Sequence, residues 1–155
     1  MPDTSISVAA TVPVPAAVIF DLLASPDRHH EVDASGTVGA DVDDAPITKT
    51  GQVFRMTMTY DGGEKRVEYQ TDNHVTEFEP NRRIAWAVAP VGGEVLGWVW
   101  RWDLQPDGDS RSKVSLTYDW TSASAENQEL YGVPVFDEHD LESSVKLLEK
   151  ALVRS

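Results

Sequence analysis

Tryptophans at alternating positions are the residues of this sequence best suited to recognising a ligand. Trp98, Trp100 and Trp102 are spaced two residues apart, and alternate residues of an extended strand lie on one face. Indole rings offer a large apolar area and one N–H donor, so this spacing is typical of a wall for a flat or apolar ligand. Packing of the same rings against a helix is the alternative. Both interpretations stay open for Trp98 and Trp100, whereas packing is favoured for Trp102, near the strand end.

Further candidate ligand-binding residues are in phase with apolar neighbours on other segments. Met58 alternates with Met56 and Phe54, and methionine suits an irregular cavity wall as well as the core packing that we favour here. Ser144 falls on the apolar side of a C-terminal helix, where its hydroxyl needs a ligand, a water or a backbone carbonyl as partner. The predicted ligand-binding residues are Met58, Tyr69, Trp86, Trp98, Trp100, Tyr118, Ser144 and Leu148.

Groups that can exchange protons on this apolar face are few. Asp103 and Asp119 are out of phase with the apolar residues of their segments. We therefore expect both to point to solvent rather than to form a catalytic pair. A buried general acid or base would come from Tyr69, Tyr118, His74 or the loop residue Tyr131.

The histidines show no metal-ligand spacing. His29 and His30 are adjacent on a predicted short helical turn, and we interpret both as exposed polar surface. His139 lies in the first turn of a predicted helix. The sequence contains no HExxH pattern, phosphate-binding loop, nucleophile elbow or GxGxxG turn into a helix. It therefore predicts neither a metal nor another cofactor.

The charge balance limits the classes of partner. Lys and Arg number 13 against 26 Asp and Glu, which gives a net charge of −13. A surface this negative repels phosphate backbones and anionic lipid, so we expect no nucleic-acid partner. The acids are dense in residues 1–48, where Arg28 is the only base. We interpret that stretch as solubilising surface, with a basic protein partner as the alternative.

Cysteine content and hydropathy exclude further classes of protein. The sequence has no cysteine, which excludes disulfides, thiolate nucleophiles and cysteine-bound metals. No basic segment followed by an apolar stretch marks a signal peptide, and the most apolar region, 8–24, is interrupted by prolines and Asp21. We expect a cytoplasmic protein without membrane insertion.

The periodicity of apolar residues predicts one strand, two short helical segments, six strands and a long helix. Asp61-Gly62-Gly63 is typical of a hairpin turn, and a change of phase predicts a bulge within 72–76. The region 122–136 is expected to be a long loop. The expected strands are 4–12, 37–42, 51–60, 66–78, 82–89, 96–104 and 113–121, with helices at 16–24 and 138–153 and a short turn through 29–30.

This order predicts an α+β fold in a single domain over residues 1–155. Sequential strands usually pair with their neighbours, so we expect an antiparallel meander. The long C-terminal helix is the element available to cover its apolar face. The expected architecture is a seven-stranded antiparallel sheet wrapped around that helix, with two short helices after the first strand.

Several stretches in this order resemble the START/polyketide-cyclase superfamily, whose helix-grip fold is shared with the birch-pollen allergens. They include Pro15-Ala16-Ala17-Val18-Ile19-Phe20-Asp21-Leu22-Leu23, Ser25-Pro26-Asp27-Arg28-His29 and Val75-Thr76-Glu77-Phe78-Glu79-Pro80-Asn81-Arg82-Arg83-Ile84-Ala85-Trp86. Relatives often carry a tryptophan after the short helices, where this chain has Glu31-Val32-Asp33. The resemblance implies an apolar ligand cavity between the sheet and the C-terminal helix.

The resemblance leaves the activity open, because members bind lipids or hormones, assist ring closure of polyketides or act as chaperone cofactors. We expect a protein that binds a small hydrophobic molecule of lipid, polyketide or aromatic type, as a monomer or homodimer. A cyclase- or dehydratase-like enzyme using the same cavity is the alternative, and a buried Tyr or His with a perturbed pKa would favour it. A protein-interaction module is the weaker alternative.

Overall fold

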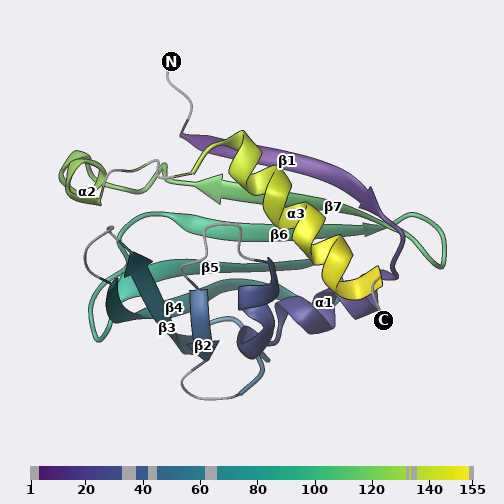
Figure 1. The fold of residues 1–155 in the computed structure, drawn as a ribbon, viewed down its shortest axis with the longest axis horizontal. Coiled ribbons are helices and arrows are strands. Elements are labelled where there is room, and N and C mark those ends of the chain that lie inside the picture. The colour runs from purple at the N-terminus through teal and green to yellow at the C-terminus, as the bar shows by residue number, and fades with distance from the viewer. Residues whose placement is uncertain are drawn as a thin grey trace.

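The computed structural model describes residues 4–32, 38–41, 45–61, 66–131, 133 and 136–153 (Figure 1). Most elements begin and end close to where the apolar pattern places them, because that pattern decides which face can be buried. The elements are β1 (Ser5–Val12), α1 (Ala16–Leu23), η1 (Pro26–Val32), β2 (Val38–Asp41), β3 (Val53–Asp61), β4 (Arg66–Glu79), β5 (Arg83–Pro90), β6 (Val99–Pro106), β7 (Ser112–Asp119), α2 (Ala125–Tyr131) and α3 (Glu138–Val153).

The strands form one antiparallel sheet in the order β1-β7-β6-β5-β4-β3-β2. The first strand therefore lies beside the last, while the strands between follow as a meander. The C-terminal helix α3 packs against β1, β7 and η1, and in Figure 1 it crosses the sheet diagonally and ends beside α1. The predicted α+β class, with a single antiparallel sheet and a C-terminal helix, is confirmed.

The core lies between the inner face of the sheet and the helices. In β1, Val8 and Val12 are buried, as expected of inward positions on a half-buried strand, whereas Ala10, which is in phase with them, is exposed. The stripe Leu141, Val145 and Leu148 of α3 is buried against this face. The apolar period of that helix therefore sets which side meets the sheet.

The predicted bulge in β4 is confirmed. The register of β4 against β5 shifts between Val75 and Glu77, so Thr76 is an additional residue on β4. Because of this shift, Val75 and Phe78, three residues apart, pair with Trp86 and Ile84 of one face of β5. The bulge therefore keeps both Val75 and Phe78 on the inner face.

Trp98 lies just before β6, which begins at Val99, so the prediction of one strand carrying three tryptophans was wrong at its start. The preceding Gly97 has a φ of 114°, and a Cβ there would approach the Cα of Ala123 to 2.2 Å. Only glycine accommodates both the positive φ and this close contact. The chain therefore bends at Gly97 and enters the strand one residue after Trp98.

The expected loop 122–136 contains the helix α2, which was not predicted. Ser124 Oγ accepts a hydrogen bond from the backbone N–H of Asn127 at 3.1 Å and caps the first turn. The Asn127 side chain donates to the carbonyl of Leu96 at 3.1 Å and ties α2 to the β5–β6 connection. Leu130 is 70% exposed, so the helix has no apolar stripe from which to be recognised.

The outer face of the sheet carries ion pairs. Arg83 contacts Asp103 and Glu77, and Arg101 contacts Asp103 at 2.9 Å. Asp103 therefore points away from the core, as its phase predicted, and has cationic rather than carboxylate neighbours. These pairs neutralise one another at a half-exposed surface and contribute little to stability.

Candidate functional site

A row of apolar and aromatic side chains crosses the centre of the inner face. Residues directly opposite each other on paired strands share a face, and the register aligns one residue from each of five neighbouring strands. The row consists of Val75 of β4, Trp86 of β5, Trp100 of β6, Tyr118 of β7 and Ile6 of β1.

Trp100 and Tyr118 form the first aromatic stack of this row. Their ring centroids lie 4.6 Å apart and their planes differ by 11°. Phe136, just before α3, meets the two rings edge to face at 5.3 and 5.7 Å. Tyr118 is 1% exposed, whereas Trp100 is half-buried. The stack therefore holds Trp100 in a fixed orientation while part of its surface stays accessible.

Trp86 and His29 form the second stack. The imidazole of His29 lies 4.9 Å from Trp86, centroid to centroid, at an interplanar angle of 17°. Phe54 of β3 meets both rings edge to face at 5.6 Å. The η1 turn is thereby attached to the sheet through aromatic contacts, and His29 becomes part of the aromatic face.

The imidazole of His29 is buried and neutral. The residue is 7% exposed, and Nε2 lies 2.7 Å from the carbonyl oxygen of Leu23, to which it donates a hydrogen bond. Burial lowers the pKa of His29 from 6.5 to about 4, an effect that the bond to Leu23 partly opposes. At neutral pH, Nδ1 is therefore an unprotonated hydrogen-bond acceptor.

The interpretation of His29 as exposed surface was wrong, whereas His30 is exposed as expected. Pro26, His29 and Val32 are the buried residues of η1, and their spacing of three is the period of a 3₁₀ helix. That spacing was the available signal. It was missed because a single short turn gives few repeats, and because two adjacent histidines look alike in sequence.

Exposure changes between neighbouring rows of the same face. Two residues further along each strand, Ile84 pairs with Trp102, which pairs with Leu116. All three are buried, and α1 packs on β5 and β6 while α3 packs on β1 and β7. In the first row, by contrast, Trp86 and Trp100 are half-buried. Trp86 and Trp100 therefore keep accessible surface on the inner face, in a row toward the end of the strands where α2 is found (Figure 1).

The predicted ligand-binding residues fall into three groups by accessibility. Trp86, Trp98 and Trp100 are half-buried around the centre of the face, and the half-buried Met58 pairs directly with Tyr69 toward its edge. Tyr69 is 43% exposed, whereas Tyr118 and Leu148 are 1% and 0% exposed. Ser144 is half-buried on α3. The structure thus brings Trp86, Trp100 and Tyr118 into one row and places Met58 and Tyr69 on the strands beyond it.

The remaining proton-exchanging candidates lie away from this row or outside the described side chains. His74 sits between Asn73 and Val75, whose partners Val88 and Trp86 share the inner face, so His74 is on the outer face. The side chain of Tyr131 lies outside the described residues, as do residues 33–37 and 42–44 of the acidic N-terminal stretch.

An exposed group formed by Asp137, His139 and Asp140 stands at the start of α3, with potential ligand atoms within 4.8 Å of one another. Asp137 Oδ1 accepts a hydrogen bond from the Asp140 backbone N–H at 3.0 Å, and this bond lowers the pKa of Asp137. The arrangement caps the helix. That role accounts for the cluster without a metal.

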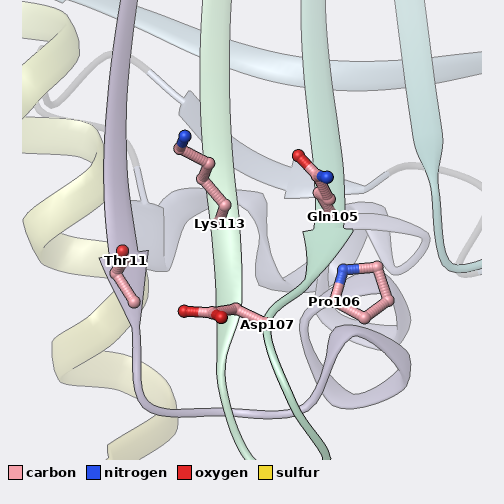
Figure 2. Close-up of a pocket in the computed structure, with 5 residues that line it drawn as sticks. All are labelled: Thr11, Gln105, Pro106, Asp107 and Lys113. Carbon is pink, nitrogen blue, oxygen red and sulfur yellow. The ribbon is translucent and has the colours of Figure 1, made fainter.

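A separate polar hollow of about 260 Å³ lies at one end of β1, β6 and β7 and is lined by Thr11, Gln105, Pro106, Asp107 and Lys113 (Figure 2). Thr11 and Lys113 pair with each other and alternate with the buried Val12 and Val114. The hollow therefore opens on the outer face. Its polar lining and its position distinguish it from the apolar inner site.

Two solved structures have a fold similar to that of this chain. The protein Ms6760 of Mycobacterium smegmatis superimposes with a TM-score of 0.68 at 14% identity, over 97% of this chain and 92% of that one. The Zhui aromatase/cyclase of a Streptomyces species superimposes with a TM-score of 0.62 at 13% identity, over 97% and 93%. At these identities the likeness establishes the fold alone.

Among curated sequences, the uncharacterized protein Rv0088 of Mycobacterium tuberculosis is 30% identical over 120 residues, which is 77% of this chain and 49% of that protein. The chain thus spans about half the length of the curated relatives it matches. In the described part of the chain, no helix has both the length and the apolar character needed to cross a membrane.

The family model described as polyketide cyclase / dehydrase and lipid transport matches residues 3–141. This range includes the whole sheet and the aromatic row described above. The expected resemblance is confirmed, and the chain belongs to the polyketide cyclase / dehydrase and lipid transport family, of SRPBCC type.

Proposed function

We propose that this chain binds a small apolar or aromatic molecule against the inner face of its sheet, with Trp86 and Trp100 as the floor of the site. One observation carries the proposal. These two indoles keep accessible surface at the centre of a face whose next row is fully buried. Exposed aromatic surface at the centre of an otherwise closed core is typical of a ligand site.

The other predicted residues take different parts in this site. Met58 and Trp98 extend the apolar surface, and Tyr69 stands at its rim. Tyr118 and Leu148 are enclosed, so in this conformation they support the floor rather than touch the ligand. Ser144 offers a hydroxyl from α3. The binding unit is taken to be one domain over residues 1–155, as a monomer or homodimer.

Area burial makes micromolar affinity attainable. Fully burying one large apolar side chain contributes about 1.5–3 kcal/mol, and micromolar binding requires about 8 kcal/mol. Three such contacts approach that value only where little ordering is needed. The two stacks already fix both indoles, which keeps the ordering cost low.

The charge of the chain favours an uncharged ligand. The protein carries a net charge of −13, which repels anions at long range. The central row contains Val75, Trp86, Trp100, Tyr118 and Ile6, and none of these side chains is charged at neutral pH. Affinity should therefore come from contact area and depend little on salt.

The alternative, a cyclase- or dehydratase-like activity, is favoured by one observation. His29 is a buried histidine with a perturbed pKa beside Trp86, and the structural relative Zhui is named an aromatase/cyclase. A general base acts best when its pKa is near the working pH, however, and the pKa of His29 is lowered to about 4. His29 is better suited to accept a hydrogen bond than to remove a proton, so binding is the preferred function.

A neutral environment-sensitive dye, N-phenyl-1-naphthylamine, tests the proposal. We expect it to fluoresce in the presence of the folded protein and to quench tryptophan emission, with little change in affinity between about 50 and 500 mM salt. Trp98→Ala and Trp100→Ala should weaken binding. Val153→Ala, at a residue that is 51% exposed at the end of α3, is the matched control. Binding that occurs only after unfolding, or that salt abolishes, would contradict the proposal.

A further inference from the structure

We propose that His29 selects among apolar ligands by accepting a hydrogen bond at Nδ1, so that the site prefers molecules carrying an O–H or N–H donor at one edge. This inference rests on the proposed binding of an apolar ligand beside Trp86 and Trp100. It adds the chemistry of the ligand that this face recognises.

The ring of His29 is held on three sides. One face stacks on Trp86 at 4.9 Å, Phe54 meets it edge to face at 5.6 Å, and Nε2 is bonded to the Leu23 carbonyl at 2.7 Å. A side chain fixed in this way loses little entropy when a ligand bonds to it. Its hydrogen-bonding atom is therefore preorganised.

The second nitrogen of the ring borders accessible space. In the described part of the chain, no buried side-chain nitrogen or oxygen lacks a hydrogen-bond partner. The hydrogen bond shown for His29 is made by Nε2, so Nδ1 is not one of the fully enclosed, unpaired atoms of the described chain. The proposal places the donor of a ligand lying on Trp86 against this atom.

The protonation state of the ring decides which partner Nδ1 takes. Because Leu23 offers a carbonyl, Nε2 carries the proton and Nδ1 carries the lone pair. Burial opposes a second proton and lowers the pKa to about 4, while the bond to Leu23 and the nearby Asp27 raise it and His30 lowers it. At neutral pH the site therefore offers a hydrogen-bond acceptor. A ligand hydroxyl or amine can donate to it, whereas a ligand group that is itself an acceptor would stay unpaired.

A purely structural role uses only one of the two ring nitrogens of His29. Nε2 satisfies the carbonyl of Leu23, the last residue of α1, and so joins α1 to η1. That role needs one donor and makes no use of Nδ1. A ligand bond to Nδ1 can therefore be tested apart from the stability of the helix end.

Two probes of similar shape separate these roles: 2-naphthol, which carries a donor, and 2-methylnaphthalene, which does not. We would measure the affinity of both for the wild-type chain, for His29→Phe and for the control His30→Phe. Phenylalanine keeps a ring able to stack on Trp86 but has no nitrogen. The ratio of the two affinities should shift against 2-naphthol by about threefold to tenfold in His29→Phe, and should stay unchanged in His30→Phe.

A measurement on the wild-type chain covers the case in which His29→Phe does not fold. The ¹⁵N resonance of His29 Nδ1 should move upfield when 2-naphthol binds and stay in place with 2-methylnaphthalene, because only the former donates to it. An unchanged affinity ratio in His29→Phe, or an Nδ1 resonance that does not shift when 2-naphthol binds, would overturn the role of His29 but not the proposed binding site. Failure of both probes to bind would overturn the proposed function and this inference with it.

Discussion

Two adjacent rows on the inner face of the sheet differ in solvent exposure. Ile84, Trp102 and Leu116 are covered by α1 and α3 and are buried. One step along the same strands, Trp86 and Trp100 keep accessible surface and stack on His29 and Tyr118 instead. The helices α1 and α3 pack over the first region, whereas in the second the rings pack on one another. The same sheet thus carries a buried row and, next to it, a row whose two tryptophans stay partly accessible.

The largest effect is expected in the closed region. Leu148 is 0% exposed and belongs to the stripe of α3 that covers the sheet. Leu148→Ala should lower the free energy of unfolding by ~2–5 kcal/mol, because it leaves a cavity in a packed core. Urea denaturation measures this, with Val153→Ala as the exposed control. An unchanged free energy of unfolding would mean that α3 is peripheral, and the contrast between the rows would lose its cause.

A pH effect of similar size should arise at the border of the two regions. The pKa of His29 is lowered from 6.5 to about 4 in the folded chain, so between these values the unfolded chain binds the extra proton. Stability should be complete above about pH 6.5 and fall as the pH drops toward 4, by an amount on the order of 3 kcal/mol.

Carboxylates act in a lower window. The pKa of Asp72 is lowered from 3.8, chiefly by the hydrogen bond from Arg55, so its contribution is lost only as the pH falls below that value. Urea denaturation of the wild-type chain and of His29→Phe between pH 4 and 7 therefore isolates the histidine. Equal slopes in both proteins would show that His29 is not buried in the neutral form.

The open region should respond in affinity rather than in stability. Trp100→Ala should weaken binding of N-phenyl-1-naphthylamine by about tenfold to a hundredfold, because a buried aromatic contact contributes about 1.5–3 kcal/mol. Fluorescence titration measures this effect. Trp102→Phe keeps a ring in the closed row and should leave the affinity within about twofold. An equal loss of affinity in both variants would show that the rows do not differ in function.

The smallest effect is expected at the rim of the site. Tyr69 is 43% exposed and pairs with Met58 on the neighbouring strand. Tyr69→Ala should weaken the same dye by about twofold to threefold, since a half-exposed side chain loses less area on binding than a central one. A loss larger than that of Trp100→Ala, in the same titration, would move the centre of the site toward the sheet edge.

The closed region was the more predictable of the two from sequence. Leu141, Val145 and Leu148 repeat with the helical period, and the inner residues of β7 alternate, so burial follows directly from periodicity. The change of phase at the β4 bulge was visible for the same reason. Each of these features is indicated by several residues that follow the same apolar period.

The open region depends on single residues whose effects are not periodic. His29 is buried through one 3₁₀ turn, and Trp98 lies outside β6 because Gly97 bends the chain with a φ of 114°. The helix α2 shows no apolar stripe, since Leu130 is exposed. The partial exposure of Trp86 could not be predicted from the sequence either, because it depends on where α1 and α3 stop covering the sheet.

The indole N–H resonances test the central claim most directly. In ¹H–¹⁵N spectra of the chain, addition of N-phenyl-1-naphthylamine should shift the indole signals of Trp86 and Trp100 and leave those of Trp102 and Trp120 in place. The first two are half-buried on the proposed floor, and the last two lie in the core. Shifts confined to Trp102 or Trp120, or no indole shift at a saturating dye concentration, would contradict a ligand site on the aromatic row.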